Sequence, residues 1–344
     1  MSSRSQNRCL VVKIGAIGDV IMCAAALNRF RELVPNVHVT WLCGSSSAVL
    51  LNKLALADHI IEIDESRLFK STLFTKSAAV LGIWKQLFWS SYDLVVVGHS
   101  DPRYQLFTKC VRAREFRSLG LSDGRRRPIP GRYHGDEYLS LFLGVDGPGQ
   151  ERATVPKIRP ELPSHLGNIF KHGQGPFVAI MPGGAKNSLA DDYQRRWPLD
   201  YYVQLSKQLR KKRINVVITG AASDAWVIEA FKGVDVINLV GQTSTLELVG
   251  VCERCDVVVT HDSGPLHLAE LSGVKIVAIF GPTSPSEKVD PFFDGVLFWG
   301  GDSLACRPCY DGKTYAKCSE ISCMRGVSPE SVLKAVLDIT EKPI

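Results

Sequence analysis

Short apolar runs alternate with amphipathic stretches along most of the chain. An apolar run at residues 9–14 is followed by a stretch from about 19 to 34, in which apolar residues recur every three or four positions. Further apolar runs lie at 37–42, 60–63 and 94–97. Strands that alternate with helices favour a parallel sheet that is covered by helices on both faces.

The alternation fades between about 147 and 176, where prolines and glycines accumulate, and then it starts again. The second half carries apolar runs at 177–181, 214–219, 236–239, 256–260 and 274–280, with an amphipathic stretch at 199–212. A last amphipathic stretch at 328–339 opens with the capping pattern Ser-Pro-Glu-Ser. We therefore predict two α/β domains, with the link between them in the proline-rich stretch.

The segment 256–285 reads DVVVTHDSGPLHLAELSGVKIVAIFGPTSP, which predicts strand, polar turn, helix and strand. In open α/β sheets, ligands bind beyond the carboxyl ends of the strands, where this turn lies. Asp262 or Ser263 can cap the helix, and the first-turn backbone N–H groups, including that of Gly264, suit a diphosphate. His267 lies about one turn into the helix, on the side toward the strand ends. The alternative interpretation is a plain helix cap and a packed histidine.

A second turn, Gly15-Ala16-Ile17-Gly18-Asp19, leads from the first strand into a helix. Asp19 either caps this helix or serves as a general base for an incoming hydroxyl. The strand at 37–42 ends without an acidic residue that would hold a ribose, so the pattern does not favour NAD binding.

A third turn, Pro182-Gly183-Gly184, precedes a polar loop and then Arg195-Arg196-Trp197-Pro198. An arginine there can neutralise a leaving diphosphate. The alternative is a surface loop with a solvated arginine pair.

The composition fits a globular protein, with 344 residues, 45% hydrophobic and 22% charged. No apolar run reaches the ~18 to 20 residues of a membrane span, and the polar start does not resemble a signal peptide. We therefore expect a cytoplasmic protein. In such a reducing compartment, the 10 cysteines are core residues or metal ligands.

Residues 103–132 hold nine lysines and arginines against two carboxylates, a balance of +7 that includes Arg125, Arg126 and Arg127. The cluster is either a solvated face or a site for an anionic acceptor at a membrane surface. No nucleic-acid motif accompanies it, so we do not expect nucleic acid as a partner.

Four cysteines, Cys306, Cys309, Cys318 and Cys323, follow the spacing C-x2-C-x8-C-x4-C. They form either a tetrahedral thiolate site or a loop with four reduced thiols. Cys252 and Cys255 also stand three apart, but we expect them to be small core residues.

The three turn motifs, in this order, resemble glycosyltransferase family 9, the ADP-heptose heptosyltransferases of bacterial lipopolysaccharide core assembly. The resemblance runs from about residue 9 to 332. It implies a GT-B fold, with two Rossmann-like domains that face each other across a cleft. The implied division is an acceptor domain at 1–165, a nucleotide-sugar domain at 166–326 with a Cys-rich segment at 306–323, and a helix at 327–344 that packs back on the first domain.

The resemblance also implies an inverting, metal-independent transfer of heptose from ADP-heptose to a lipopolysaccharide inner-core acceptor. Asp19 corresponds to the general base, and Gly18 with Arg125, Arg126 and Arg127 to the acceptor side. The donor side comprises Gly183, Arg196, Asp262, Ser263, Gly264, Pro265, His267 and Thr283. Arg196 stands where the family usually has a lysine, and the long preceding loop leaves Lys186 and Arg195 as alternatives.

The sequence also leaves other functions open. A similar cysteine cluster occurs in heptosyltransferases that modify autotransporter proteins, where it is associated with iron, so the acceptor is either a glycolipid, a protein or a small molecule. A sugar-nucleotide epimerase fits the motifs less well. A non-catalytic scaffold that binds sugar nucleotides is the alternative of another class. We expect no cofactor for catalysis, a structural Zn or Fe at the cysteines as an option, and peripheral contact with the inner membrane.

Overall fold

A computed structural model describes residues 7–69, 72–119, 129–145, 150–170, 175–186, 191–310 and 315–341. The chain divides into two compact units, Met1–Pro156 and Lys157–Ile344. The division falls inside the proline-rich stretch, nine residues before the boundary expected at 165. Each unit is described by itself.

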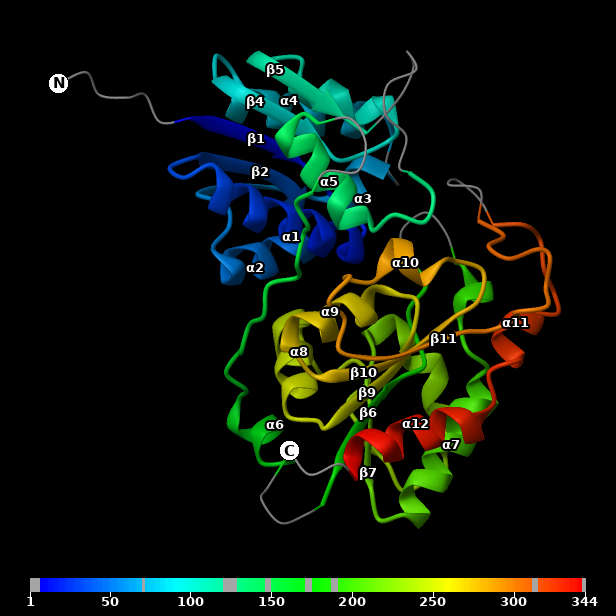
Figure 1. Ribbon diagram of the computed structural model, residues 1–344. Coiled ribbons are helices and arrows are strands. Elements are labelled where there is room, and N and C mark those ends of the chain that lie inside the picture. Colours follow the sequence, from blue (N-terminus) through cyan, green and yellow to red (C-terminus); the bar gives the residue numbers. More distant parts are fainter. Residues whose placement is uncertain are drawn as a thin grey trace. The chain divides into compact units, whose positions relative to one another are not determined.

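The first unit is a five-stranded sheet in the order β3-β2-β1-β4-β5, with every neighbouring pair parallel. The strands are β1 (Arg8–Val12), β2 (His38–Gly44), β3 (His59–Ile63), β4 (Ser91–Val97) and β5 (Arg112–Ser118). The helices are α1 (Ile17–Leu33), α2 (Ser45–Leu54), α3 (Glu65–Phe69), α4 (Leu73–Leu87), η1 (Pro102–Thr108) and α5 (His134–Leu143). Helices α1 and α5 pack together, whereas α4 and η1 cover the apolar core on the other side of the sheet (Figure 1).

The second unit is a six-stranded parallel sheet in the order β11-β10-β9-β6-β7-β8. The strands are β6 (Phe177–Met181), β7 (Asn215–Ile218), β8 (Ile237–Asn238), β9 (Val257–His261), β10 (Lys275–Phe280) and β11 (Gly295–Trp299). The longer helices are α7 (Leu199–Lys211), η3 (Ala222–Phe231), α8 (Thr245–Glu253), α9 (Gly264–Ser272) and α12 (Pro329–Thr340). The short ones are α6 (Ser164–Gly167), η2 (Tyr193–Arg195), α10 (Pro285–Lys288) and α11 (Ser322–Arg325).

The central strands of both sheets are apolar because both of their faces are buried. In β6 all five residues are buried, and β9 is likewise buried throughout. Helices α7 and α12 lie side by side on one face of the second sheet, and α8 packs against α9 on the other (Figure 1). Both strand orders are doubly wound and Rossmann-like, which confirms the predicted α/β class.

Two strands lie outside the sequence prediction. Strand β5 consists largely of charged and exposed residues, so it forms no apolar run. Strand β11 has the apolar sequence GVLFW and is only partly buried, and the sequence prediction did not include it. The contacts of α12 are with α7, β9 and β10 of its own unit, where Val332 and Val336 enter the core. Packing of the C-terminal helix on the first domain stays a prediction. No helix in the described residues is long and apolar enough to cross a membrane.

Candidate active site

The second unit gathers its polar turns at the point where the strand order reverses. Strands β6 and β9 are neighbours in the middle of the sheet, and the chain leaves them toward opposite edges. Gly183 and Gly184 follow β6, Asp262 follows β9, and Thr283 follows the adjacent β10. Ligands of doubly wound sheets bind outside the carboxyl ends of such strands.

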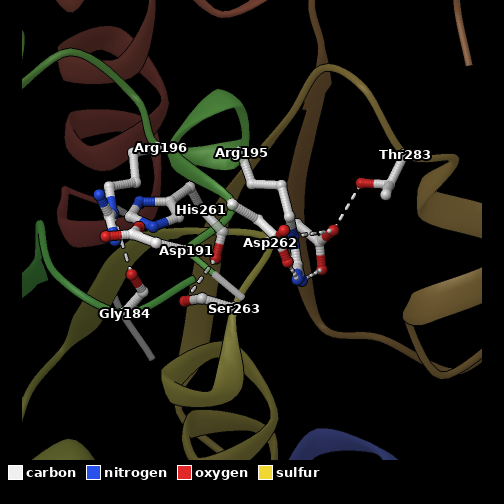
Figure 2. Close-up of polar contacts among 9 residues, drawn as sticks. Gly184, Asp191, Arg195, Arg196, His261, Asp262, Ser263 and Thr283 are labelled. Atoms are coloured by element: carbon white, nitrogen blue, oxygen red, sulfur yellow. Dashed lines mark hydrogen bonds and ion pairs between the residues drawn. The ribbon is translucent and has the colours of Figure 1, made fainter. Parts of the chain in front are cut away.

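Asp262 is the centre of this group, and its carboxylate is almost completely buried, at 1% exposure. Arg195 contacts it twice: Nε donates a hydrogen bond to Oδ2 at 3.1 Å, and Nη2 forms an ion pair with Oδ1 at 2.9 Å. Thr283 Oγ1 donates to Oδ2 at 2.5 Å. Figure 2 shows the carboxylate lying between the arginine and the threonine. A carboxylate held from two sides keeps one orientation.

The charge state of Asp262 follows from these contacts. Burial alone raises the pKa of the carboxyl, but Arg195, Lys288 and the bond from Thr283 outweigh it and lower the pKa to about 2. Burial opposes the charge on Arg195 as well, yet Asp262 raises the pKa of the guanidinium. The pair is therefore ionised at neutral pH.

The cation at Asp262 is Arg195, which the sequence offered only as an alternative. Arg196 points elsewhere: Nη2 pairs with Asp191 at 2.5 Å, and Nε donates to the Gly184 carbonyl at 3.0 Å (Figure 2). Its guanidinium also lies over the Trp226 ring, 5.2 Å from the centroid. Lys186, the other alternative, lies 3.9 Å from Asp191.

Gly183 and Gly184 bring the β6 turn close to its neighbours. A Cβ on Gly183 would stand 2.4 Å from Asp224 Cγ, and Gly184 has a φ of +82°, which favours glycine. Asp224 Oδ1 accepts from the Gly184 N–H at 3.0 Å, while its Oδ2 accepts from the Ala221 N–H at 2.9 Å. One buried carboxylate therefore ties the turn after β6 to the start of η3.

Helix α9 begins directly after Asp262. Ser263 is its N-cap residue, but no side-chain bond caps the helix, and Ser263 Oγ donates instead to the His261 carbonyl at 3.2 Å. Gly264 and Pro265 form the first turn, and a proline suits this position because it lacks an N–H. A helix start without a side-chain cap leaves its backbone dipole available for an anion.

Two buried histidines flank this helix start. His261 Nδ1 lies 3.0 Å from the Tyr202 hydroxyl, and burial lowers the pKa of His261 to about 3, so the ring is neutral. His267 Nδ1 lies 2.9 Å from Glu270 Oε2 within α9, and both side chains are buried. The sequence prediction did not include His261 or Tyr202 as site residues. His261 is a polar residue at the end of an apolar strand, and this position alone does not indicate a role in the site.

The strand order of the first sheet reverses between β1 and β4, which are neighbours. Asp19 follows β1 at this point of the sheet. Asp19 is in the first turn of α1, and its carboxylate accepts from Lys13 Nζ at 3.1 Å. The Lys13 side chain is 4% exposed and the Asp19 side chain 35%, so the carboxylate is open to solvent while its partner is not. Gly18 is buried in the same turn.

His99, which follows β4, completes this turn. His99 Nε2 accepts from the Ile14 N–H at 3.0 Å, and its ring stacks on Tyr104 with centroids 3.6 Å apart. Burial, then Lys13, lower the pKa of His99 well below its ordinary value, which agrees with a neutral acceptor nitrogen. The lone lysine in the apolar run VVKIG is the one sequence signal for this group, and the sequence prediction did not include it.

The predicted acceptor residues Arg125, Arg126 and Arg127 lie outside the described residues. Other members of the basic cluster are described and several are paired: Arg103 with Asp101, Arg117 with Glu115, and Arg132 with the buried Glu137. Part of the cluster is therefore structural.

The four cysteines of the predicted metal site are all free thiols. The Ile321 N–H donates to Cys318 Sγ at 3.2 Å. Among the described residues, no three His, Cys, Asp or Glu side chains are arranged to hold a metal ion. The segment contacts both loops beside Asp262: the Cys309 N–H donates to the Pro282 carbonyl at 3.0 Å, and Tyr193 donates to the Cys318 carbonyl at 2.7 Å.

Comparisons with known proteins agree with this architecture. Residues 140–318 match the model of glycosyltransferase family 9 (heptosyltransferase). Lipooligosaccharide heptosyltransferase 2 of Haemophilus influenzae is 31% identical over 304 residues, which cover 80% of this chain and 84% of that protein. The Escherichia coli ADP-heptose lipopolysaccharide heptosyltransferase II has a similar structure, with a TM-score of 0.69 at 18% identity over 97% of this chain and 98% of that one.

A third similar structure is the iron-containing dodecameric glycosyltransferase TibC from enterotoxigenic E. coli, with a TM-score of 0.60 at 13% identity. It covers 99% of this chain and 78% of that one. The two Rossmann-like units are those of a GT-B fold. The family match over residues 140–318 and the 31% identical relative make the chain a glycosyltransferase. The chain belongs to glycosyltransferase family 9.

Proposed function

We propose that this enzyme transfers heptose from ADP-heptose to an inner-core lipopolysaccharide acceptor, with inversion at the anomeric carbon. The observation that carries the proposal is the ionised Asp262 beside an uncapped helix start, at the strand reversal of a family 9 chain. The H. influenzae relative is named for lipooligosaccharide and the E. coli neighbour for ADP-heptose, and both names support this substrate pair.

The second unit holds the donor in this proposal. The diphosphate lies at the first turn of α9, where the N–H groups of Ser263 and Gly264 and the helix dipole favour negative charge. Asp262 accepts hydrogen bonds from the hydroxyls of the donor sugar, and Thr283 and Arg195 fix its orientation. His267 contacts the donor from the next turn of the helix. Pro265 and Gly183 shape the backbone around it.

We assign the cation beside the leaving diphosphate to Arg195 rather than Arg196. Arg195 comes from the turn η2 and is joined to the residue that precedes α9, whereas Arg196 holds the Gly184 loop through its carbonyl. Arg196 then supports the donor site by fixing the glycine turn.

The first unit supplies the base. Asp19 takes the proton of the acceptor hydroxyl as that oxygen forms a bond to the anomeric carbon, on the face opposite the diphosphate. The bond from the anomeric carbon to the diphosphate oxygen breaks, and ADP leaves with the negative charge. The helix N-terminus and Arg195 stabilise this charge as it develops. Lys13 keeps the Asp19 carboxylate in place.

Asp19→Asn tests this assignment because the amide keeps the size and loses the basicity. We expect transfer to fall by about 100-fold or more, with unchanged ADP affinity in a calorimetric titration. Asp101→Asn is the matched control, because Asp101 is also a carboxylate of the first unit but caps η1 and pairs with Arg103. Tighter binding of UDP or GDP than of ADP would rule out ADP-heptose as the donor. Full activity of Asp19→Asn would rule out Asp19 as the general base.

The Cys-rich segment supports a second proposal on the same enzyme. Four free thiols with this spacing can hold a structural Zn or Fe, and the segment touches both loops that hold Asp262. Such a metal would brace the donor site without taking part in the reaction. Metal analysis of the purified chain and of Cys306→Ser/Cys309→Ser tests this, and absence of metal from both would reject it. If a metal is present, a protein acceptor like that of the autotransporter enzymes becomes the second candidate to assay.

A further inference from the structure

The exposed apolar side chains of the described residues concentrate on one helix of the first unit. Phe74, Leu81, Phe88 and Trp89 are 85%, 60%, 61% and 71% exposed, and among the other described residues Phe292, at 66%, and Val49, at 56%, come nearest. All four belong to α4 or to the two residues that follow it, and α4 lies on the face of the first sheet opposite α1 and α5 (Figure 1). Isolated exposed apolar residues are normal, but several on one helix indicate a binding surface.

The spacing of these residues gives α4 a second apolar face. Phe74, Leu81 and Phe88 are seven residues apart, so they return to the same side of the helix every two turns. Ile83 and Leu87 lie on the opposite side and are buried in the core of the unit. The stripe through Leu81 is therefore additional to the face that folding uses.

The charged residues in this stretch of sequence have one sign. From Ser66 to Tyr92 the sequence contains no Asp or Glu, and it contains Arg67, Lys70, Lys76 and Lys85. Lys85 is exposed within the stripe itself. At its end, the guanidinium of Arg112 from β5 lies over the Trp89 ring, 5.3 Å from the centroid. An anionic partner complements this surface.

A second copy of the chain fits the stripe poorly. In a two-fold symmetric dimer the same patch meets itself, so Lys85 and Arg112 would face other cations with no carboxylate on the helix to pair them. A bilayer satisfies both parts at once, because phenylalanine and tryptophan enter the headgroup boundary while lysine and arginine meet lipid phosphates.

We propose that the α4 face, defined as Phe74, Leu81, Lys85, Phe88 and Trp89 together with Arg112, docks on an anionic lipid surface. The proposal extends the proposed function, since a lipopolysaccharide acceptor is anchored in a membrane. Docking can be tested separately from heptose transfer, because vesicle binding needs neither donor nor acceptor.

The experiment is co-sedimentation of the full chain with vesicles of phosphatidylglycerol and phosphatidylethanolamine, with phosphatidylcholine vesicles as the uncharged reference. We expect binding to the anionic vesicles that weakens as salt rises. Phe74→Ser/Trp89→Ser should lower the partition coefficient at least about tenfold, because two aromatic side chains no longer leave water. Lys85→Glu should lower it about fivefold or more. Phe292→Ser, an equally exposed aromatic in the second unit, is the matched control and should leave it unchanged.

Three outcomes would overturn the proposal: no binding by the unmutated chain, equal binding to both vesicle types, or equal losses in the Phe292→Ser control. A dimer in light scattering that Phe74→Ser/Trp89→Ser converts to a monomer, without vesicle binding, would assign the face to a second copy instead. Transfer to a deacylated, water-soluble acceptor should be unaffected by Phe74→Ser/Trp89→Ser. Failure of the unmutated chain in that assay would count against the proposed function alone.

Discussion

Replacing Arg195 by methionine isolates the ion pair at the centre of the donor site. The variant keeps a long apolar stem and removes both the hydrogen bond and the ion pair to Asp262. The difference between the ordinary pKa of 3.8 and about 2 corresponds to roughly 2 kcal/mol in favour of the ionised carboxylate. Without the guanidinium the buried charge keeps only the coulombic attraction of Lys288 and the bond from Thr283. Removing one partner of a buried ion pair costs about 3–5 kcal/mol.

The loss should depend on pH in a defined direction. In the unmutated chain the lowered pKa of Asp262 contributes stability that is present above about pH 4 and is lost as the pH falls toward 2. In Arg195→Met, burial dominates and raises the pKa of Asp262 above its ordinary value, so the folded chain becomes less stable as the pH rises from about 4. The gap between the two proteins therefore widens with pH and levels off above the new pKa.

The measurement is urea unfolding between pH 4.5 and 7.5, followed by hydrogen exchange of peptides from β9 and α9, which report on the second unit alone. Arg196→Met is the matched control, and its loss should stay near 1 kcal/mol or below, because its partner Asp191 is half-exposed. Asp262→Asn in the Arg195→Met background should restore part of the stability. A larger loss in Arg196→Met, or a pH-independent loss in Arg195→Met, would refute the reasoning.

Two further predictions concern the buried groups around this pair. Gly183→Ala should cost the second unit about 1–3 kcal/mol, since the new Cβ would stand 2.4 Å from Asp224 Cγ, and an unchanged unfolding midpoint would contradict the close approach. His261 is buried and its pKa is lowered to about 3. At mildly acidic pH its side chain is therefore protonated in the unfolded chain and neutral in the folded chain. Between about pH 6 and pH 3 this histidine should therefore lower the unfolding free energy by about 1.4 kcal/mol per pH unit as the pH falls, and His261→Gln should flatten this part of the profile. Identical slopes in both proteins would argue against a neutral buried His261.

The sequence was informative where burial forces a simple pattern. Strands β6 and β10 were predictable because a central parallel strand is apolar on both faces, and the turn at Asp262 was predictable because it separates two such strands. Strand β5 was not, since it lies at the sheet edge, where charged side chains are tolerated.

Contacts between distant residues were beyond reach. Arg195 and Arg196 are neighbours of the same type, and only the folded turn η2 decides which of them reaches Asp262, 67 positions further on. The ties from Asp224 to Gly184 and from Lys13 to Asp19 likewise depend on side chains meeting in space. Residue type and spacing predict that a polar site exists, whereas its pairings require the three-dimensional path of the chain.

The charged edge strand β5 has a consequence for the solubility of the chain. Among the described residues only one of its sides pairs, with β4, so the other offers backbone N–H and C=O groups to any extended segment that approaches. Arg112, Arg114 and Glu115 are exposed along it. If a second copy of this edge came alongside, like charges would be brought together and would lose their hydration. Natural sheets use this cost to avoid strand-by-strand aggregation. The arginines on β5 therefore protect the sheet edge from pairing with another chain, whether or not they also bind a ligand.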